Sequence, residues 1–320
     1  MVNETAGRKA ALICGSVAYD TILVFPDRFK AHILPDKLHI LNVAFLVPEM
    51  RREFGGCAAN IAYGLNLLGD EGVCMAAAGH DFAPYRERLA AQGIDVDYIK
   101  RIDDAFTAQA FITTDSDNNQ ITAFHPGAMQ YAHQNQVTDA LRGARGAGIA
   151  LGIVAPDGRQ AMIEHAAQFR AARIPFIFDP GQGLPMFDAG ELRLFIEQAT
   201  WVAVNDYEWG MMQQKTGLSV DDIVAQVEAL IVTRGAEGST IFTKQRSWSV
   251  APVKPRAVVD PTGCGDAFRA GLIHGLLHDL GWEAIGRTAS LMGSWKIESR
   301  GPQNYRFTKA EFERILKMGS

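Results

Sequence analysis

The 320-residue sequence predicts an α/β fold, in which helices cover both faces of a mostly parallel central sheet and a small β lid lies outside it. Two observations support this fold class. From about residue 137 onward, strand-like and helix-like patterns alternate along the chain. Such alternation is typical of parallel strands joined by right-handed helical crossovers. Two earlier stretches, residues 20–50 and 101–126, are rich in strand-like segments and lack this alternation.

The predicted core elements are short apolar runs, each followed by a stretch with helical spacing of its apolar residues. The first strand covers Ala10–Gly15 and ends in a glycine. Further strands are expected at 149–154, 175–179, 201–204 and 229–233, and helices at 60–68, 84–92, 158–172, 189–198 and 220–228. A last apolar run, Ala257–Val259, is typical of the end of a strand, and helical spacing follows it from Phe268 to Leu277.

The small sheet is predicted from a hairpin pattern. Within residues 101–126, strand-like segments at 108–113 and 120–124 flank a run of turn-forming residues. Residues 20–50 contain short apolar pieces between prolines and are expected to join the same discontinuous sheet. The α/β core then consists of residues 1–19, 51–100 and 127–320.

Composition excludes several functional classes. The chain has 31 basic and 36 acidic residues, a formal charge of −5 and no block of like charge, which disfavours nucleic-acid binding. No apolar run reaches the ~18 residues of a membrane helix, and residues 1–9 do not resemble a signal peptide. The cysteines Cys14, Cys57, Cys74 and Cys264 are scattered without C-x-x-C spacing, so we expect reduced thiols in a cytoplasmic protein.

The segment Asp260–Phe268 carries the strongest functional signal. Gly263 and Gly265 permit a tight turn and a close approach of a ligand to the backbone. Because a helix follows, its free N–H groups and its dipole form an anion site suited to a phosphate. An acid at the rim of such a site, Asp266, could take a proton from a hydroxyl that attacks phosphorus. The alternative is that Asp266 caps the helix.

The loop Gly263–Asp266 and three further polar loops, Gly15–Asp20, Asn205–Glu208 and Thr233–Gly235, all follow predicted strands. In open parallel sheets, ligands bind beyond the carboxyl ends of the strands. These loops should therefore converge on one edge of the sheet.

Three motifs in this order resemble those of the ribokinase-like (PfkB) carbohydrate and nucleoside kinases. The late motif is Asp260–Asp266, the early one is Gly55-Gly56-Cys57-Ala58-Ala59-Asn60-Ile61-Ala62, and Asn205-Asp206-Tyr207-Glu208 lies between them. The resemblance covers residues 10 to 315. It implies a ribokinase-like fold and an ATP-dependent kinase that uses Mg²⁺ and acts on a primary hydroxyl.

The resemblance also implies roles for residues near the sugar. Asp20 would grip vicinal hydroxyls, because a carboxylate accepts two hydrogen bonds. Gly55 and Gly56 would bring backbone N–H groups close to the sugar, and the Asn60 amide would offer a donor and an acceptor. The alternatives are an aspartate in a turn and a strand–helix turn that needs glycine only for its conformation.

A second group of residues would bind the nucleotide. Asn205 and Glu208 would hold Mg²⁺ through water, since this ion keeps most of its waters; capping of a helix is the alternative. Thr233, Gly235 and Gly238 would line the phosphates and ribose of ATP, and the role of Arg234 is left open.

A third group matches positions where relatives hold a monovalent cation such as K⁺: Asp260, Thr262, Lys296 and Gly301. Pro261 stands where the family more often has threonine, which puts this cation in doubt. His274 and His278 lie four residues apart in the helix that is predicted to follow the late motif. Without an H-E-x-x-H pattern or a visible third ligand, we interpret them as surface or packing residues rather than a metal site.

The mechanism expected from the resemblance uses Asp266 as general base, with the backbone N–H groups of Gly263, Cys264 and Gly265 on the γ-phosphoryl. A carboxylate with a pKa of about 4 suffices, because the transition state is loose. The segments Cys14–Thr21, Ala123–Ala128 and Phe178–Gly183 are most similar to bacterial adenosine or nucleoside kinases.

A nucleoside would require an apolar slot for its base. Phe124, together with Phe111, Met129 and Tyr131, could stack on a purine, and a core role is the alternative for each. The expected product is a nucleoside monophosphate such as AMP. A ribokinase or fructokinase, and a non-catalytic nucleoside-binding regulator, are the other interpretations. The preferred base and the choice between monomer and homodimer are left open.

Overall fold

Nine strands of the computed structural model form one sheet in the order β13-β12-β11-β10-β9-β8-β1-β4-β5. The structure describes residues 9–33, 39–40, 42–117, 119–143 and 148–318. The strands of this sheet are β1 Ala10–Cys14, β4 Glu71–Gly79, β5 Ile99–Ile102, β8 Ile149–Val154, β9 Phe176–Phe178, β10 Trp201–Asn205, β11 Ala229–Thr233, β12 Ser239–Phe242 and β13 Ser247–Val250. In this sheet order, every neighbouring pair from β11 through to β5 is parallel, whereas β12 is antiparallel to both of its neighbours.

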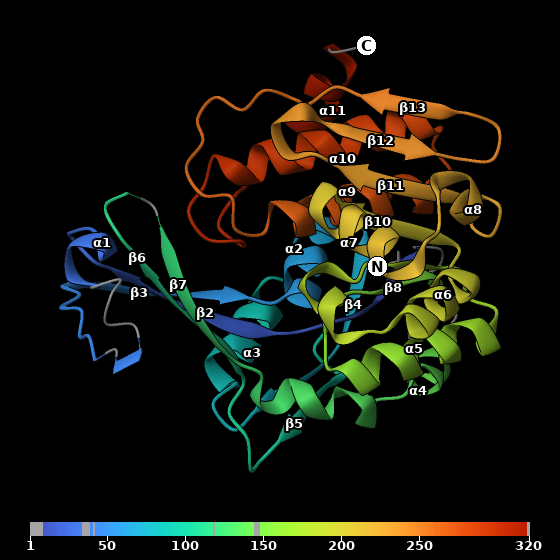
Figure 1. The fold of residues 1–320 in the computed structure, drawn as a ribbon. Helices are drawn as coiled ribbons and strands as arrows, with labels where there is room; N and C mark the ends of the chain where they lie inside the picture. The colour runs from blue at the N-terminus through green and yellow to red at the C-terminus, as the bar shows by residue number, and fades with distance from the viewer. Residues whose placement is uncertain (1–8, 34–38, 41, 118, 144–147, 319–320) are drawn as a thin grey trace, which may run out of the picture.

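Helices cover both faces of this sheet, as predicted (Figure 1). One face carries α2 Cys57–Leu68, α3 Ala83–Ala91, α9 Cys264–Leu277, α10 Trp282–Ile297 and α11 Lys309–Met318. The other carries α4 Val137–Arg142, α5 Arg159–Ala172, α6 Ala189–Gln198, α7 Asp206–Thr216 and α8 Val220–Val224. Short 3₁₀ helices cover Gly127–Gln134, Gly181–Met186 and Gly235–Glu237.

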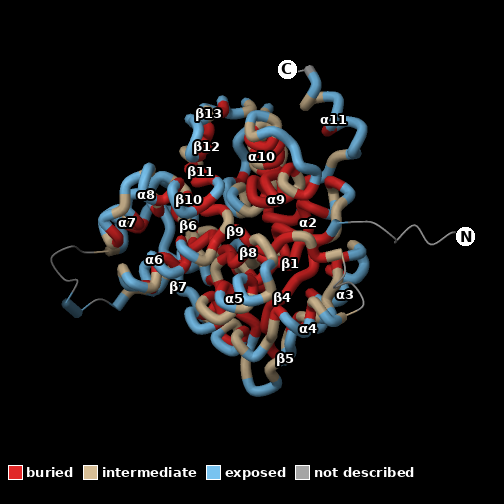
Figure 2. The backbone as a smooth tube through the Cα atoms, turned by 90° about the vertical axis from the view of Figure 1, so that its right-hand side faces the viewer, coloured by how far each residue is buried: buried red, intermediate tan, exposed pale blue. Residues whose placement is uncertain are grey.

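The hydrophobic core is divided into two layers by the alternation of side chains along the strands. In β1, Ala11 and Ile13 pack with α2 and α9 on one face. Leu12 and Cys14 pack with α5 and α6 on the other. Figure 2 shows the buried residues concentrated along the central strands and along α2 and α9.

A second sheet of four strands, in the order β3-β2-β6-β7, projects from one side of the core (Figure 1). It consists of β2 Ala18–Val24, β3 Glu49–Gly55, β6 Ala108–Thr114 and β7 Gln120–His125, with the short helix α1 Phe29–His32 between β2 and β3. The predicted hairpin is the β6–β7 pair. Strands β2 and β3 extend beyond the predicted lid range of 20–50, and residues 34–38 and 41 of that range lie outside the described residues. The division into core and lid domains stays a prediction.

Several sequence expectations were wrong or incomplete. Residues 257–259 form no strand: Val258 is 73% exposed, and the Val259 N–H donates to the Ile297 carbonyl at the end of α10. The helix expected at 220–228 ends at Val224, because the Glu228 N–H bonds to Thr200 as the chain enters β11. The elements missed by the pattern include β4, β5, β12, β13, α4, α7, α10 and α11.

All four cysteines are free, and Cys14 and Cys74 are buried. Within the described ranges, no helix combines the length and apolarity needed to cross a bilayer.

Helices α2 and α9 lie side by side in both views (Figures 1 and 2), and contacts at successive turns show that they run in the same direction. Asn60 near the start of α2 contacts Asp266 near the start of α9. One turn further along, a Cβ on Gly64 would lie 2.6 Å from the Cβ of Ala270. Glycine at position 64 therefore permits the close contact between the two helices.

We expect Gly64→Ala to lower the melting temperature, because the added methyl must push α2 away from α9. Overpacking of this kind costs about 1–3 kcal/mol. Gly210→Ala is the matched control, since no atom lies within 4 Å of its added Cβ. At this exposed site in α7 the same substitution should stabilise the protein by about 0.4–1 kcal/mol. A Gly64→Ala protein that melts at or above the wild-type temperature would contradict the packing argument.

Candidate active site

The loop before α9 is the candidate anion-binding part of the site. Gly263 occupies the N-cap with φ +81°, and a Cβ there would lie 2.6 Å from the Cβ of Pro302. A Cβ on Gly265 would meet no atom within 4 Å, so space lies in front of the first turn. The Cys264 N–H donates to the Pro261 carbonyl over 3.1 Å. Of the three predicted phosphate donors, this one would have to exchange its partner to bind a phosphate.

Asp266 lies in the first turn of α9 and is partly buried. The Asn60 side-chain amide donates to its Oδ2 over 2.8 Å, and the Asn60 Oδ1 accepts a bond of 2.9 Å from Gln303. Burial raises the pKa of Asp266 to about 7, the Asn60 hydrogen bond opposes this, and the negative charge of Asp179 adds to it. This value is above the ordinary carboxyl pKa of about 4 that the sequence suggested. Gln303 was missed because no motif contains it.

The glycine pair at the start of α2 fits its surroundings closely. Gly56 is the N-cap with φ +92°, and a Cβ there would lie 2.5 Å from the Val17 Cα. A Cβ on Gly55 would lie 2.5 Å from the Asp20 carboxylate. Any side chain at position 55 would therefore occupy the space that this carboxylate uses.

Asp20 lies within β2 rather than in a turn. Burial raises the pKa of its carboxyl to about 6, and the nearby charges of Asp260 and Glu53 contribute. A site with several acceptors and few donors suits a ligand that offers hydroxyl groups.

Strand pairing places Asp20 and Phe124 on the same face of the lid. Asp20 pairs with Glu53 on one side and with Ala110 on the other, and Ala110 pairs with Phe124. Directly paired residues point to the same face of a sheet. Phe124 is 51% exposed there, whereas Phe111 is one position away from Ala110 and faces the opposite side.

A buried ion pair that sequence reasoning missed connects α9 to the segment that follows β9. Arg269 on α9 donates from Nε and Nη2 to the two carboxylate oxygens of Asp179, each over 3.0 Å. Both side chains are less than 8% exposed. Asp179 lies in the segment Phe178–Gly183, which resembles nucleoside kinases. The spacing of residues in the sequence does not predict its contact with Arg269, which lies 90 positions later.

The predicted magnesium residues form a helix cap. The Asn205 backbone N–H and side-chain amide each donate to one Glu208 carboxylate oxygen over 2.8 Å, and the Glu208 N–H donates back over 2.7 Å. The structure therefore shows the capping interaction, and the Mg²⁺ role of these two residues stays a prediction. Burial raises the pKa of Glu208, and the Asp179 charge adds to this.

The loop after β11 brings together the residues predicted to bind ATP. Thr233 ends the strand, and Gly235 and Gly238 have φ values of +51° and +90°. A Cβ on Gly238 would lie 2.2 Å from the Val250 carbonyl oxygen, whereas Gly235 faces open space. The side chain of Arg234 donates to Thr240.

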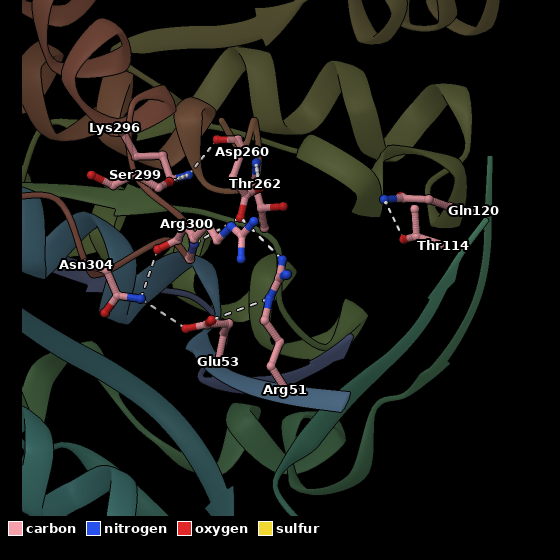
Figure 3. Close-up of polar contacts among 11 residues, drawn as sticks. Arg51, Glu53, Thr114, Gln120, Asp260, Thr262, Lys296, Ser299, Arg300 and Asn304 are labelled. Carbon is pink, nitrogen blue, oxygen red and sulfur yellow. Dashed lines mark hydrogen bonds and ion pairs between the residues drawn. The ribbon is translucent and has the colours of Figure 1, made fainter. Parts of the chain in front are cut away.

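The four residues predicted for a monovalent cation meet in one cluster (Figure 3). The Asp260 carboxylate accepts bonds of 2.9 Å from the backbone N–H groups of Thr262 and Gly301. The fully buried Lys296 ammonium donates to the carbonyl oxygens of Asp260, at 2.7 Å, and Ser299, at 3.1 Å. An ion using these two carbonyl oxygens would have to displace the ammonium, so the cluster fits K⁺ poorly.

The lid contacts the core beside this cluster (Figure 3). From β3, Arg51 reaches within 3.9 Å of the Asp260 carboxylate and 3.6 Å of Glu53. Glu53 accepts a bond of 3.0 Å from Asn304. The face of the lid that carries Asp20 is thereby tied to the segment that follows α10.

A hollow of about 750 Å³ lies elsewhere, along β13, α10 and α11. Its lining includes Val250, Arg287, Leu291 and Arg314, and none of the predicted site residues. The candidate site is therefore defined by the loops that converge at the strand ends.

Comparisons with known proteins identify the family of this chain. Residues 19–309 match the pfkB family of carbohydrate kinases. The chain is 31% identical over 264 residues to a nucleoside kinase of Methanocaldococcus jannaschii, which is 82% of this chain and 85% of that protein. It is also 31% identical over 291 residues to a nucleoside kinase of Methanothermobacter thermautotrophicus, with 89% and 91% covered.

Solved structures extend the likeness to the whole fold. The structure of Burkholderia thailandensis nucleoside kinase in complex with inosine matches with a TM-score of 0.86 and 50% identity, over 96% of this chain and 97% of that one. The same protein in complex with ADP-inosine matches with a TM-score of 0.84 and 51% identity, over 96% and 95%. The predicted ribokinase-like fold and ATP-dependent nucleoside kinase activity are confirmed. The chain belongs to the pfkB family of carbohydrate kinases, within which it is a nucleoside kinase.

Proposed function

We propose that the protein transfers the γ-phosphoryl group of ATP to the 5′-hydroxyl of a purine nucleoside such as inosine or adenosine. The observation that carries this proposal is the contact between Asn60 and Asp266, because it supports Asp266 as a proton acceptor at the candidate anion-binding loop of α9. Inosine is bound by the Burkholderia relative that is 50% identical to this chain.

In the proposed reaction, Asp266 accepts the proton of the attacking hydroxyl as the oxygen–phosphorus bond forms and ADP leaves. The N–H groups of Gly263 and Gly265, at the positive end of the α9 dipole, stabilise the transferring phosphoryl group. A raised pKa matches Asp266 to proton transfer near neutral pH.

Mg²⁺ bound with ATP would offset the phosphate charges, and Asn205 and Glu208 are the residues that would hold it. Both Glu208 oxygens already accept bonds from Asn205. We therefore propose contact through water, which this ion retains readily. We propose no K⁺ requirement, because the Lys296 ammonium already supplies a positive charge at the Asp260 cluster.

The lid face that carries Asp20 and Phe124 accounts for a nucleoside in preference to a bare sugar. We propose that Asp20 accepts hydrogen bonds from the ribose hydroxyls and that the exposed Phe124 ring, on the same face, stacks on the base. A purine offers the larger surface for such stacking.

The substrate proposal is tested by ADP release from ATP and Mg²⁺ with adenosine, inosine, guanosine, cytidine, ribose and fructose as acceptors. We expect turnover with purine nucleosides and none with the free sugars, because these leave the Phe124 face empty. Turnover with a free sugar alone would overturn the role given to the lid while leaving that of Asp266 intact.

Asp266→Asn should lower kcat by about 10²–10⁴-fold, since the amide cannot accept the proton. Nucleoside binding, measured by calorimetry, should persist because the side chain keeps its shape. Asp221→Asn, an exposed first-turn aspartate of α8, is the control for loss of one charge. Retention of more than about a tenth of the wild-type rate by folded Asp266→Asn would exclude Asp266 as the base.

The pKa of Asp266 predicts the pH dependence of the reaction. The carboxylate must be ionised to act as a base, so kcat/KM should rise as the pH increases through about 7 and level off above it. The profile is recorded with saturating Mg²⁺ on wild type and Asn60→Ala.

The Asn60→Ala profile separates titration of Asp266 from titration of the ATP phosphate, whose second pKa is about 6. Loss of the Asn60 hydrogen bond raises the pKa of Asp266 further, so the acid limb should move to higher pH. A limb that stays at the same pH in both proteins would assign it to the phosphate and contradict the prediction.

A further inference from the structure

Three side chains with metal-ligating atoms meet on the far end of α9 from the anion-binding loop. Asp70, in the turn between α2 and β4, contacts both histidines of the i, i+4 pair. The His274 Nδ1 lies 2.5 Å from Asp70 Oδ2, and the His278 Nε2 lies 2.8 Å from Asp70 Oδ1. The structure thus supplies the third ligand that the sequence did not reveal.

The backbone fixes both sides of this cluster. The α2 helix ends at Gly69 with φ +87°, and the Asp70 N–H bonds back to the Leu65 carbonyl. In the same way, the chain leaves α9 through Asp279 with φ +52°, and the Leu280 N–H bonds back to Gly275. Asp70 and the two histidines are therefore carried by tightly closed helix ends rather than by a loose loop.

Electrostatics at this point favour a cation. Since α2 and α9 run in the same direction, the negative ends of both helix dipoles lie here, next to a carboxylate. Burial opposes ionisation of Asp70, but the hydrogen bonds to His274 and His278 outweigh it and hold the pKa of this carboxyl below its usual value.

The donor set identifies the kind of cation. Two imidazoles and one carboxylate suit borderline divalent ions such as Zn²⁺, whereas Mg²⁺ and Ca²⁺ prefer oxygen ligands alone. One ligand atom from each residue lies within 4.8 Å of the others. A metal ion bonded at about 2.0–2.2 Å to each of three ligand atoms holds those atoms close to one another. Only small shifts of the three side chains would therefore be needed to bind the ion here. The exposed fraction of the His278 side chain, 48%, leaves a path from solvent and room for a water ligand.

We propose that Asp70, His274 and His278 form a binding site for a divalent transition-metal ion of the Zn²⁺ class, separate from the kinase site. A bound ion would take the place of the direct contacts that the two imidazoles now make with Asp70.

The test uses the full-length protein, stripped with a chelator and equilibrated with Zn²⁺ in the presence of excess Mg²⁺, which occupies oxygen-only sites. Bound zinc is measured by elemental analysis after dialysis, and Co²⁺ replaces Zn²⁺ for visible spectroscopy. We expect about one ion per chain. His278→Gln and Asp70→Asn should each weaken binding at least about 100-fold, since even an outer-shell loss costs about 10–100-fold.

His32→Gln is the matched control, because His32 is 40% exposed and bonded to Asp27. It should leave zinc binding unchanged. Unchanged binding in folded His278→Gln, or a wild-type chain that holds no ion, would overturn the proposal. The Co²⁺ spectrum needs no variant: nitrogen and oxygen ligation supports the site, and the charge-transfer absorption of thiolate ligation would assign the metal to cysteine and overturn it.

Discussion

The parallel contact between α2 and α9 is the constraint on which the rest of the site depends. Gly64 and Ala270 approach so closely that they fix the position of one helix along the axis of the other. This register sets Asn60 opposite Asp266. Because the helices run in the same direction, both N-termini lie at the carboxyl edge of the sheet. Their combined positive potential suits an anionic substrate, and the glycines at their starts, Gly56 and Gly263, leave the backbone free of side chains there.

The charges under this edge explain how an acid can remain beside a phosphate site. Asp179 raises the pKa of Asp266 and Arg269 lowers it, and these two residues neutralise one another in a buried pair. The desolvation of Asp266 is therefore the dominant effect on its proton affinity. Removing one partner of such a pair leaves an uncompensated buried charge and costs about 3–5 kcal/mol. The pair thus connects α9 to the end of β9, and the pKa of Asp266, the proposed general base, stays near 7.

The sequence predicted the parts of the fold whose patterns are local. Periodicity and turn residues predict the strands β1, β8 and β11, the β6–β7 hairpin and the glycine loop before α9. Contacts between distant segments could not be predicted in this way. Gln303 reaches Asn60 across 243 positions, and Asp70 meets His274 across 204. The apolar run 257–259 has the local sequence pattern of a strand, but it forms none. An apolar segment becomes a buried strand only where a neighbouring strand pairs with it, and a local sequence pattern does not show whether that neighbour exists.

The joint between lid and core follows from the same geometry. Strand β3 ends at Gly55 and α2 begins at Cys57, so a single residue connects the lid to the helix that carries Asn60. Gly56 is held against the backbone at Ser16 to Ala18, where β2 begins. Two lid strands therefore leave the core at one tightly packed point. The position of Asp20 relative to Asp266 is set there, and the remainder of the lid sheet, including Phe124, extends from it. Residues at the joint thus determine how the lid face that carries Asp20 and Phe124 is placed relative to Asp266.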